Sequence, residues 1–447
     1  MHPNIALAPG RPATIWNRLR AFAPYLGPAF LVSVGYMDPG NWGTNIAGGA
    51  AFGYSLLWVL LLSNIMALIL QMLAAKLGIV TGRTLAENCR DHFSKPVAIA
   101  LWIVVEIAML ATDMAEFLGA ALGFKILFHI PLFPAALITG VVVFLVLAIY
   151  RYGFRAFEGI VLAMVATVGV CYVIEISTVG GLIHWAQVLH GVFIPTLPAR
   201  PAFAMSSDAS IVVAIGMLGA TVMPHNLFLH SGVIKTRVGM ENNIDTPGER
   251  DVHTRKVVHF SVLDSLLALN IAWLINSAMI ILAAATFFRH GIAVTSLEQA
   301  YATLKPLLGA AAPTVFGIAL LAAGVSSSVT GTLAGQMVME GFLRREFSVL
   351  LRRGLTMVPA LIVIYLMPRT GWGDTQILVI SQVCLSLALP FVVIPLLMFT
   401  RRKDLMREHV NKPFTNAIAG ACVALIIALN VLLIWHTFGG ALPFSQG

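Results

Sequence analysis

The residues best suited to chemistry in this sequence interrupt an apolar run near the amino terminus, where Asp38-Pro39-Gly40-Asn41 occurs. Asp38 is the key residue, because a carboxylate at membrane depth needs a proton or a cation as its partner. The apolar run around it contains no Lys or Arg. A bound cation is therefore the natural counter-charge for Asp38, and Asn41 offers an amide oxygen beside it.

A second interruption, Met223-Pro224-His225, lies in a later apolar run that also lacks Lys and Arg. The thioether of Met223 is a poor ligand for Mg²⁺ and Ca²⁺, which prefer shells made only of oxygen. Thioethers suit softer transition metals, whereas carboxylate and carbonyl groups also suit Mn²⁺. A shell of oxygens with one sulfur favours Mn²⁺, Fe²⁺ and the toxic mimic Cd²⁺. The alternative for Met223 is apolar packing, the usual role of methionine.

Both motifs are predicted to break a helix. Pro39 and Pro224 each remove a backbone donor and clash with the preceding turn, and Gly40 tolerates non-helical angles. Unwound backbone is acceptable in lipid only where its freed groups line a cavity or meet a ligand. Carbonyl groups near Gly35 and Ala220 are therefore further candidate ligands. A lone proline is more often a harmless kink, but a polar group at both breaks favours one shared central site.

Eleven apolar runs are long enough to carry these motifs across a membrane, which takes about 20 residues per helix. The runs cover about 24–51, 54–79, 97–122, 132–150, 157–178, 210–234, 260–287, 311–340, 347–367, 375–400 and 414–438. The two interruptions are five spans apart, and this odd spacing gives the two halves opposite orientations. Paired interruptions of this kind indicate the substrate site of a transporter built from inverted repeats.

We therefore expect an all-α polytopic membrane protein with 11 transmembrane helices. It would contain an inverted repeat of five plus five helices, with helices 1 and 6 broken, and one extra helix. The expected parts are a tail at 1–23, a first repeat at 24–178, a second repeat at 210–400 and the eleventh helix at 414–438.

Composition supports this class. Of the 447 residues, 58% are hydrophobic and 11% are charged, against about 25% charged in soluble domains. The mean hydropathy is +0.87. A soluble enzyme, a disordered chain, a coiled coil and a secreted disulfide scaffold are excluded, and continuous apolar runs disfavour a β-barrel. The four cysteines lie far apart, which suggests neither a disulfide framework nor a zinc site.

The basic residues predict an orientation. With the N-terminus inside, 23 of the 28 Lys and Arg fall on the cytoplasmic side, as the positive-inside rule requires. The net charge of +8 is then explained by cytoplasmic loops rather than by nucleic acid. We expect a multi-pass protein of the bacterial inner membrane, with the N-terminus cytoplasmic and the C-terminus outside.

At these motifs the sequence resembles the Nramp family (natural resistance-associated macrophage proteins), proton-coupled importers of divalent transition metals. The resemblance runs from about residue 24 to 438 and includes residues 111–117 and Ser381-Gln382-Val383. It implies an inverted-repeat fold of the amino-acid-transporter type. It also implies a set of metal ligands: the side chains of Asp38, Asn41 and Met223, the carbonyls of Gly35 and Ala220, and Gln382 in some states. Magnesium-transporting relatives lack the methionine that this sequence keeps.

A stripe of acids forms a candidate proton route. Glu106, Asp113 and Glu116 have offsets of 7 and 3, which place them on one helical face. Three carboxylates at membrane depth must bind protons or pair with cations. Arg352 and Arg353 are candidate partners, although they could equally be positive-inside flanks of their span. The family resemblance implies a network that leads protons to the cytoplasm, with Asp38 itself taking a proton.

Two histidines and several other polar residues are less specific. His225 could bind metal through a neutral imidazole, but the resemblance implies a proton-linked or gating role beside the site. His230 is a candidate gate or solvent-lining residue. Gly331-Thr332-Leu333-Ala334-Gly335 suggests close helix packing. No role is assigned to four further acids, which are Glu158, Glu175, Asp264 and Glu340.

The predicted function is a secondary active transporter that imports Mn²⁺ or Fe²⁺, and also Cd²⁺, by proton-coupled symport with alternating access. The alternative is a sodium-coupled amino-acid transporter of the same fold, although Asp38 would repel a substrate carboxylate. A membrane metalloprotease would need His-Glu-x-x-His spacing, and a primary pump would need a nucleotide-binding loop; neither motif occurs. A passive channel remains a further alternative. The expected partners are metal ions, protons and the lipid bilayer, with no cofactor, nucleic acid or obligate protein partner.

Overall fold

The structure is a computed structural model that describes residues 22–149, 153–198, 209–238, 247–292, 294, 296–345, 348–371 and 373–438. Within these ranges the chain forms helices and connecting segments and no strand. The expected N-terminal tail lies almost wholly outside them, as does Arg151 from the predicted basic loops. The expectation of an all-helical chain is confirmed for the described residues.

Ten helices are long and apolar enough to cross a membrane in the described part of the chain, and Pro28–Met37 forms a shorter apolar helix. Together they account for the eleven expected crossings. The crossings are α2 (Pro28–Ser33) with α3 (Pro39–Phe52), α4 (Leu57–Thr81), α6 (Lys95–Phe128), α7 (Leu132–Ile149), α8 (Phe154–Val179), α10 (Ala209–Thr221) with α11 (Pro224–Val233), α13 (Pro247–Ala283), α15 (Ala312–Leu343), α16 (Val349–Thr370), α17 (Asp374–Ala388) with α18 (Pro390–Thr400), and α20 (Pro413–Thr437).

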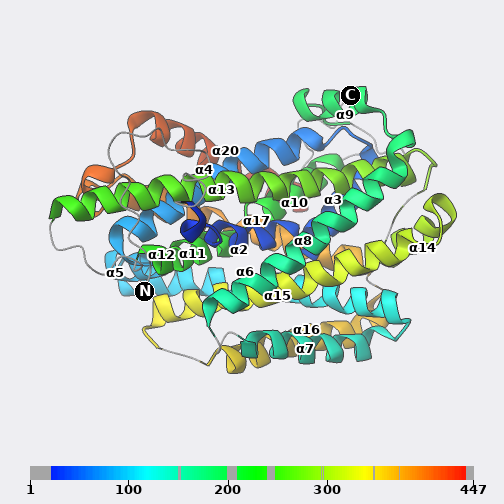
Figure 1. The fold of residues 1–447 in the computed structure, drawn as a ribbon, viewed down its shortest axis with the longest axis horizontal. Helices are drawn as coiled ribbons and strands as arrows, with labels where there is room; N and C mark the ends of the chain where they lie inside the picture. The colour runs from blue at the N-terminus through cyan, green and yellow to red at the C-terminus, as the bar shows by residue number, and fades with distance from the viewer. Residues whose placement is uncertain are drawn as a thin grey trace.

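Shorter helices mark the two ends of the bundle (Figure 1). At one end lie α5 (Leu85–His92) and α12 (Lys235–Val238), and at the other lie α9 (Trp185–Phe193) and α14 (Leu297–Leu308). We refer to these as the α5 end and the α9 end. The long helices run between the two ends in Figure 1. The short helices fall within the stretches that the sequence analysis treated as loops.

Each predicted break begins a new helix. The first span passes from α2 through a 3₁₀ turn, η2 (Val34–Met37), to Asp38, whose extended backbone caps α3 before Pro39. In the second, Met223 has extended backbone angles and precedes Pro224, the first residue of α11. Proline is favoured at the first helical position, where its missing N–H would have no partner in any case. The interruptions are therefore true helix starts rather than kinks.

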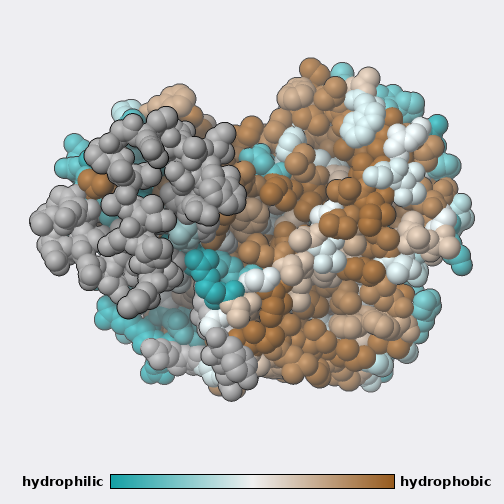
Figure 2. Space-filling model, viewed as in Figure 1, coloured by the Kyte–Doolittle hydropathy of each residue, from teal (hydrophilic) through white to brown (hydrophobic). Residues whose placement is uncertain are grey.

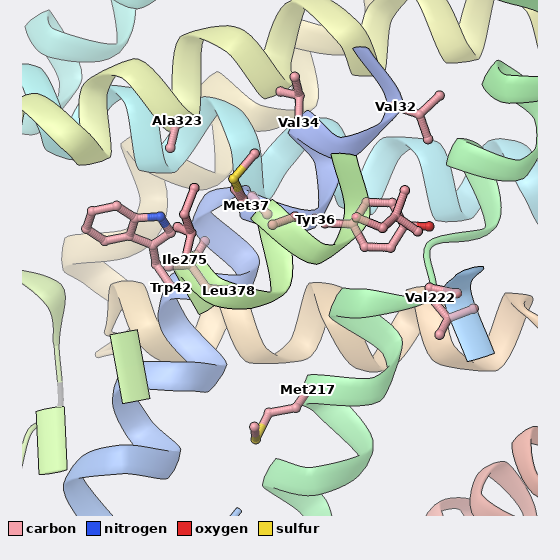
Figure 3. Packing of buried hydrophobic residues seen from close by; sticks show 14 of the residues in the cluster. Val32, Val34, Tyr36, Met37, Trp42, Met217, Val222, Ile275, Ala323 and Leu378 are labelled. Carbon is pink, nitrogen blue, oxygen red and sulfur yellow. The ribbon is translucent and has the colours of Figure 1, made fainter. Parts of the chain in front are cut away.

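The two broken spans lie at the centre of the bundle. Of the apolar window in the span Ser210–Val238, 89% is buried, against 33% in the window of Val349–Thr370. Large apolar side chains are exposed on the outer helices, and Figure 2 shows hydrophobic residues over much of the middle of the visible face. Around the first break, Figure 3 shows buried Tyr36, Met37 and Trp42 packed among neighbouring helices. This packing holds both unwound segments away from the outer surface.

Candidate metal site

Three oxygens from the two broken spans converge on the amide group of Asn41. Its Nδ2 lies 2.8 Å from Oδ1 of Asp38, 3.0 Å from the carbonyl oxygen of Ala220 and 3.2 Å from that of Gly35. Oxygens that surround one point create a negative potential there and favour a positive group. The four predicted ligands other than Met223 and Gln382 therefore lie together in one compact centre, formed by the 3₁₀ turn after α2, by the start of α3 and by the end of α10.

The same centre has unused acceptor atoms. Oδ2 of Asp38 and Oδ1 of Asn41 are buried, and neither has a hydrogen-bond partner among the described residues. Met223 is fully buried and follows Ala220 by three residues in the unwound segment. A buried acceptor without a partner is costly unless water or an ion satisfies it. The centre therefore combines carboxylate, amide and carbonyl oxygens that can still accept a cation.

Gln382 lies against this centre from α17. A Cβ atom added at Gly40 would overlap its amide and would lie 3.1 Å from Oδ2 of Asp38. Gly40 has no positive φ and sits in the first turn of α3. Gly40 was expected to allow non-helical backbone angles, but its role in the structure is to leave room for Gln382. The Oε1 atom of Gln382 is buried with no hydrogen-bond partner in the described ranges.

The acid stripe on α6 faces two buried arginines of α16. Arg352 donates to Oε1 of Glu106 at 2.9 Å, and Arg353 donates to Oδ1 of Asp113 at 3.2 Å. The arginine side chains are 3% and 0% exposed. Both arginines therefore pair with acids of the stripe, and they do so within the first turns of α16. Arg353 also donates to Ser328 of α15 at 2.9 Å, which joins a third helix to the network.

Glu116 differs from the other two acids. It is fully buried, and neither carboxylate oxygen has a hydrogen-bond partner within the described chain. One turn further along α6, a Cβ at Gly119 would overlap Pro39, so Glu116 lies close to the first break. A Cβ at Gly331 of α15 would lie 2.5 Å from Oε2 of Glu116. The stripe therefore extends from the break toward the α5 end, where α6 begins.

The glycines of α15 make room for this network. A Cβ at Gly335 would overlap the guanidinium group of Arg352, whose Nη1 donates to the Gly335 carbonyl at 2.5 Å. This stretch was expected to form a surface for close helix packing. At Gly331 and Gly335 the space instead holds the polar groups of Glu116 and Arg352.

Both histidines of the second broken span are buried. His225 is 2% exposed, and its Nδ1 has no hydrogen-bond partner in the part of the chain that the structure describes. Nδ1 of His230 lies 2.9 Å from Oε1 of Gln71, and Nε2 of Gln71 donates to the Tyr36 hydroxyl at 2.8 Å. This chain links the two broken spans through α4. His230 is fully buried, so it does not line solvent in this structure.

Several supporting residues were missed by the sequence analysis. Nδ2 of Asn276 in α13 donates to the Tyr36 carbonyl at 2.5 Å, and Oδ1 of Asn276 accepts from Asn45 at 2.6 Å. Asn226 lies so close to Gly35 that an added Cβ would overlap its amide. The available signal was an amide side chain inside an apolar run. Such groups need a partner at membrane depth, but the sequence does not say which one.

The fold and this buried centre define a multi-pass helical membrane protein with a polar site between two broken spans. A family model described as natural resistance-associated macrophage protein-like matches residues 29–436. The chain belongs to this family, as its motifs predicted.

Individual relatives cover nearly the whole chain. The chain is 45% identical to the "Divalent metal cation transporter MntH" of Agrobacterium fabrum, over 98% of this chain and 92% of that protein. It is 43% identical to the protein of the same name in Granulibacter bethesdensis, over 94% and 90% respectively. A crystal structure of the Eremococcus coleocola manganese transporter with an aromatic bis-isothiourea substituted compound matches with a TM-score of 0.82 at 34% identity, over 98% and 91%. These relatives are named as transporters and not as enzymes.

Proposed function

We propose that this protein imports divalent transition-metal ions, namely Mn²⁺, Fe²⁺ and Cd²⁺, by proton-coupled symport with alternating access. The observation that carries the proposal is the convergence of oxygens from Asp38, Gly35 and Ala220 on one buried point. The names of the relatives, divalent metal cation transporters and a manganese transporter, support it.

In this proposal the transported metal is bound by the side chains of Asp38, Asn41 and Met223 and by the carbonyls of Gly35 and Ala220. Asp38 supplies the negative charge, and rotation of the Asn41 amide presents Oδ1 to the ion. Met223 supplies the one soft ligand, its thioether sulfur. This ligand contributes least to the binding of Mg²⁺ and Ca²⁺. Gln382 lies against Gly40 and joins the shell when the surrounding helices move.

The burial of the centre supports the alternating-access part of this proposal. Asp38, Asn41 and Met223 are fully buried, so an ion reaches them only when helices separate on one side of the membrane. Of the four half-helices that meet at the centre, α2 and α11 extend from it toward the α5 end (Figure 1), and their displacement would open it. His225 and His230, which lie on α11, would then act as proton-linked or gating residues.

The acid stripe is the proposed proton route. Glu106 and Asp113 each have an arginine partner, whereas Glu116 has none in the described residues. Glu116 is therefore the carboxyl group of the stripe that we expect to hold a proton. A proton released from Asp38 on metal binding would pass to Glu116 and then along the stripe toward the α5 end.

The proposed location is the bacterial inner membrane, with the α5 end in the cytoplasm. Basic side chains at this end include Arg83, Arg90 and Arg344, all close to Asp91. This agrees with the positive-inside rule. The N-terminus would then be cytoplasmic and the C-terminus outside.

Uptake into proteoliposomes tests the proposal. The protein is reconstituted with an internal metal dye and an internal pH dye, and Mn²⁺ is added outside under a proton gradient. We expect saturable Mn²⁺ entry with acidification of the interior, and accumulation against the metal gradient. Uptake that only equilibrates would indicate a passive channel, and sodium-dependent amino-acid uptake without metal uptake would favour the alternative transporter.

Asp38→Asn tests the centre itself. Removing the only charge among the proposed ligands should abolish saturable Mn²⁺ uptake, a loss of well over tenfold, because each factor of ten needs only about 1.4 kcal/mol. The matched control is Glu298→Gln, which neutralises an acid on α14 at the α9 end. Near-normal uptake with unchanged apparent affinity in Asp38→Asn would contradict the proposed site.

A further inference from the structure

One buried carboxyl group lies on the α9 side of the metal centre. Glu175 of α8 is 1% exposed, and neither of its carboxylate oxygens has a hydrogen-bond partner among the residues that the structure describes. α8 begins at the α5 end, where Glu158 pairs with Arg237 of α12, and η4 (Gly180–Leu182) joins it to α9. Glu175 is four residues from the end of α8 at Val179, so it lies in the half of the bundle nearer α9 (Figure 1).

The helices around Glu175 supply no counter-charge in the described part of the chain. α2, α7, α13, α15 and η4 pack against α8, and α2, α7 and η4 contain no titratable residue. Asp264 is the last such residue of α13 and Glu340 is the only one of α15, and both lie in the α5 half of the bundle. At the α9 end, Arg289 donates to the carbonyl of Leu182, seven residues beyond Glu175.

Two further polar groups next to Glu175 lack partners. Tyr172 precedes Glu175 by three residues, so both side chains lie on one face of α8. The Tyr172 hydroxyl is buried with no hydrogen-bond partner in the described ranges. The same holds for the indole N–H of Trp42 on α3, whose ring packs edge-on against that of Tyr172 with centroids 5.3 Å apart. The backbone N–H of Trp42 donates to the Asp38 carbonyl at 3.2 Å. Tyr172 thus lies between Glu175 and the first break.

Burial without a partner determines what Glu175 binds. A carboxylate in an apolar environment loses its hydration, and it takes up a proton where no cation pairs with it. A metal ion fits poorly, because Mg²⁺, Ca²⁺ and Mn²⁺ take about six oxygen ligands, whereas Tyr172 offers a single further oxygen. A proton needs only one oxygen. Glu175 is therefore a neutral carboxylic acid in this structure.

We propose that Glu175 is a proton-binding site on the α9 side of the metal centre and that it passes its proton to Asp38. In this transfer Glu175 becomes a carboxylate, Oδ2 of Asp38 receives the proton, and a proton from the α9 side restores the acid. Tyr172 lies between them, and its hydroxyl can both accept and donate. The acid stripe of α6 extends from the break toward the α5 end, so Glu175 adds a carboxyl group in the other half. The direction of transfer rests on the proposed function, whereas the proton-binding site does not.

Infrared spectroscopy of the purified protein tests the site. A neutral carboxylic acid has a C=O stretching band that is separate from the bands of carboxylates and amides. Glu175→Gln should remove one such band at neutral pH, and Glu175→Asp should keep a band at a shifted position. The control is Glu298→Gln, because Glu298 is half-exposed and pairs with Lys125; it should leave these bands unchanged. If the spectra of Glu175→Gln and the unsubstituted protein coincide in this region, the proton-binding site is overturned.

Proton flux tests the transfer. In vesicles with internal pH and metal dyes, Glu175→Gln should slow metal-driven proton entry several-fold. Mn²⁺ binding to the purified variant should stay unchanged, since no proposed metal ligand is altered, and Glu175→Asp should restore part of the proton flux. Loss of the infrared band with an unchanged rate of proton entry would overturn the transfer. If the unsubstituted protein moves Mn²⁺ without protons, the proposed coupling and the transfer both fail, and the infrared result still decides the site.

Discussion

At the scale of single residues, the two carboxylate oxygens of Asp38 have different roles. Its Oδ1 accepts from the backbone N–H and the side-chain amide of Asn41, each at 2.8 Å. Its Oδ2 is buried with no hydrogen-bond partner among the residues described. The first oxygen caps α3 and fixes the orientation of the side chain. The second has no partner among the described residues and can accept the proposed cation, so one carboxylate would combine helix capping with ligation.

Met223→Ala tests whether the sulfur discriminates between metals. Cd²⁺ uptake should fall most, because Cd²⁺ is the softest candidate ion, and Mn²⁺ uptake should fall less because oxygen ligands also serve it. Ca²⁺ or Mg²⁺ should compete about tenfold better, which needs only about 1.4 kcal/mol of differential binding. The measurement is Mn²⁺ and Cd²⁺ uptake with and without millimolar Ca²⁺ or Mg²⁺. An equal loss for all metals, with no new sensitivity to Ca²⁺ or Mg²⁺, would mean that Met223 only packs.

At the scale of elements, α6 is the helix that connects the centre with the α5 end. It touches the first break at Gly119, carries Glu116 one turn earlier and carries Glu106 nearer its start. Two neighbouring helices complete the proposed proton route, with α16 supplying the arginines and α15 supplying the space. The route thus depends on the packing of three helices, of which only α6 bears the acids.

Asp113→Asn tests whether proton entry can be reduced more than Mn²⁺ entry. It removes one partner of the Asp113–Arg353 pair but leaves the metal centre intact. We expect metal-driven proton entry to fall more than Mn²⁺ entry, as measured with the internal pH and metal dyes in the same vesicles. Equal proportional losses would show that the stripe is structural or serves both ions. Asp374→Asn, an acid at the start of α17, is the matched control.

Gly331→Ala tests the space beside Glu116. The new methyl group would lie 2.5 Å from Oε2 of Glu116, and overpacking of this kind costs about 1–3 kcal/mol. The melting temperature of the purified protein should therefore fall. The control is Gly420→Ala in α20, where an added Cβ meets nothing within 4 Å. That change should leave the melting temperature unchanged or raise it, since alanine favours helices over glycine. If Gly331→Ala and Gly420→Ala change the melting temperature equally, the overlap with Glu116 is not the cause of the destabilisation.

At the scale of the whole molecule, charged contacts at the α5 end join helices that are distant in sequence. Oδ1 of Asp91 in α5 accepts from Arg90 at 2.9 Å and from Arg344, just after α15, at 3.1 Å. Arg83 contacts the other carboxylate oxygen. The N–H of Leu85 in α5 donates to Ser231 of α11 at 2.9 Å. The short helix α5 therefore links the second broken span to α15.

The charge of Asp91 gives this link a predictable pH dependence. Partial burial acts to raise the pKa of Asp91, but hydrogen bonds and ion pairs with Arg90, Arg344 and Arg83 outweigh it and hold the pKa below its usual value. A lowered pKa in the folded state stabilises the protein at pH values above the ordinary aspartate pKa of about 3.9. This stabilisation is lost as the pH falls through the folded-state value.

Asp91→Asn should therefore lower the melting temperature at pH 7, by an amount equivalent to about 1 kcal/mol. The difference from the unsubstituted protein should shrink as the pH falls below about 4. The control is Asp404→Asn, since Asp404 is largely exposed and its ion pair joins it to Arg402, two residues away. A difference that stays constant down to pH 3 would show that the charge of Asp91 is not responsible.

The sequence alone determined the number of crossings, the two breaks and the residues that occupy them. Length and hydropathy are local properties, and Pro39 and Pro224 act on their own turns, so the eleven crossings and both helix starts follow from short segments. Asp38 was identifiable because a lone charge in an apolar run is costly wherever the run lies. Four further acids at membrane depth could be recognised for the same reason, although no role could be assigned to them from the sequence: Glu158, Glu175, Asp264 and Glu340.

The tertiary structure alone decided which groups meet. Asn41 contacts the carbonyl of Ala220 at a sequence separation of 179 residues, Arg353 contacts Asp113 at a separation of 240, and Arg237 contacts Glu158 at a separation of 79. No local pattern encodes such distances, because they depend on how whole helices pack. The room that Gly40 leaves for Gln382 has the same origin, since a glycine looks alike in sequence whether it bends its own backbone or admits a neighbouring side chain.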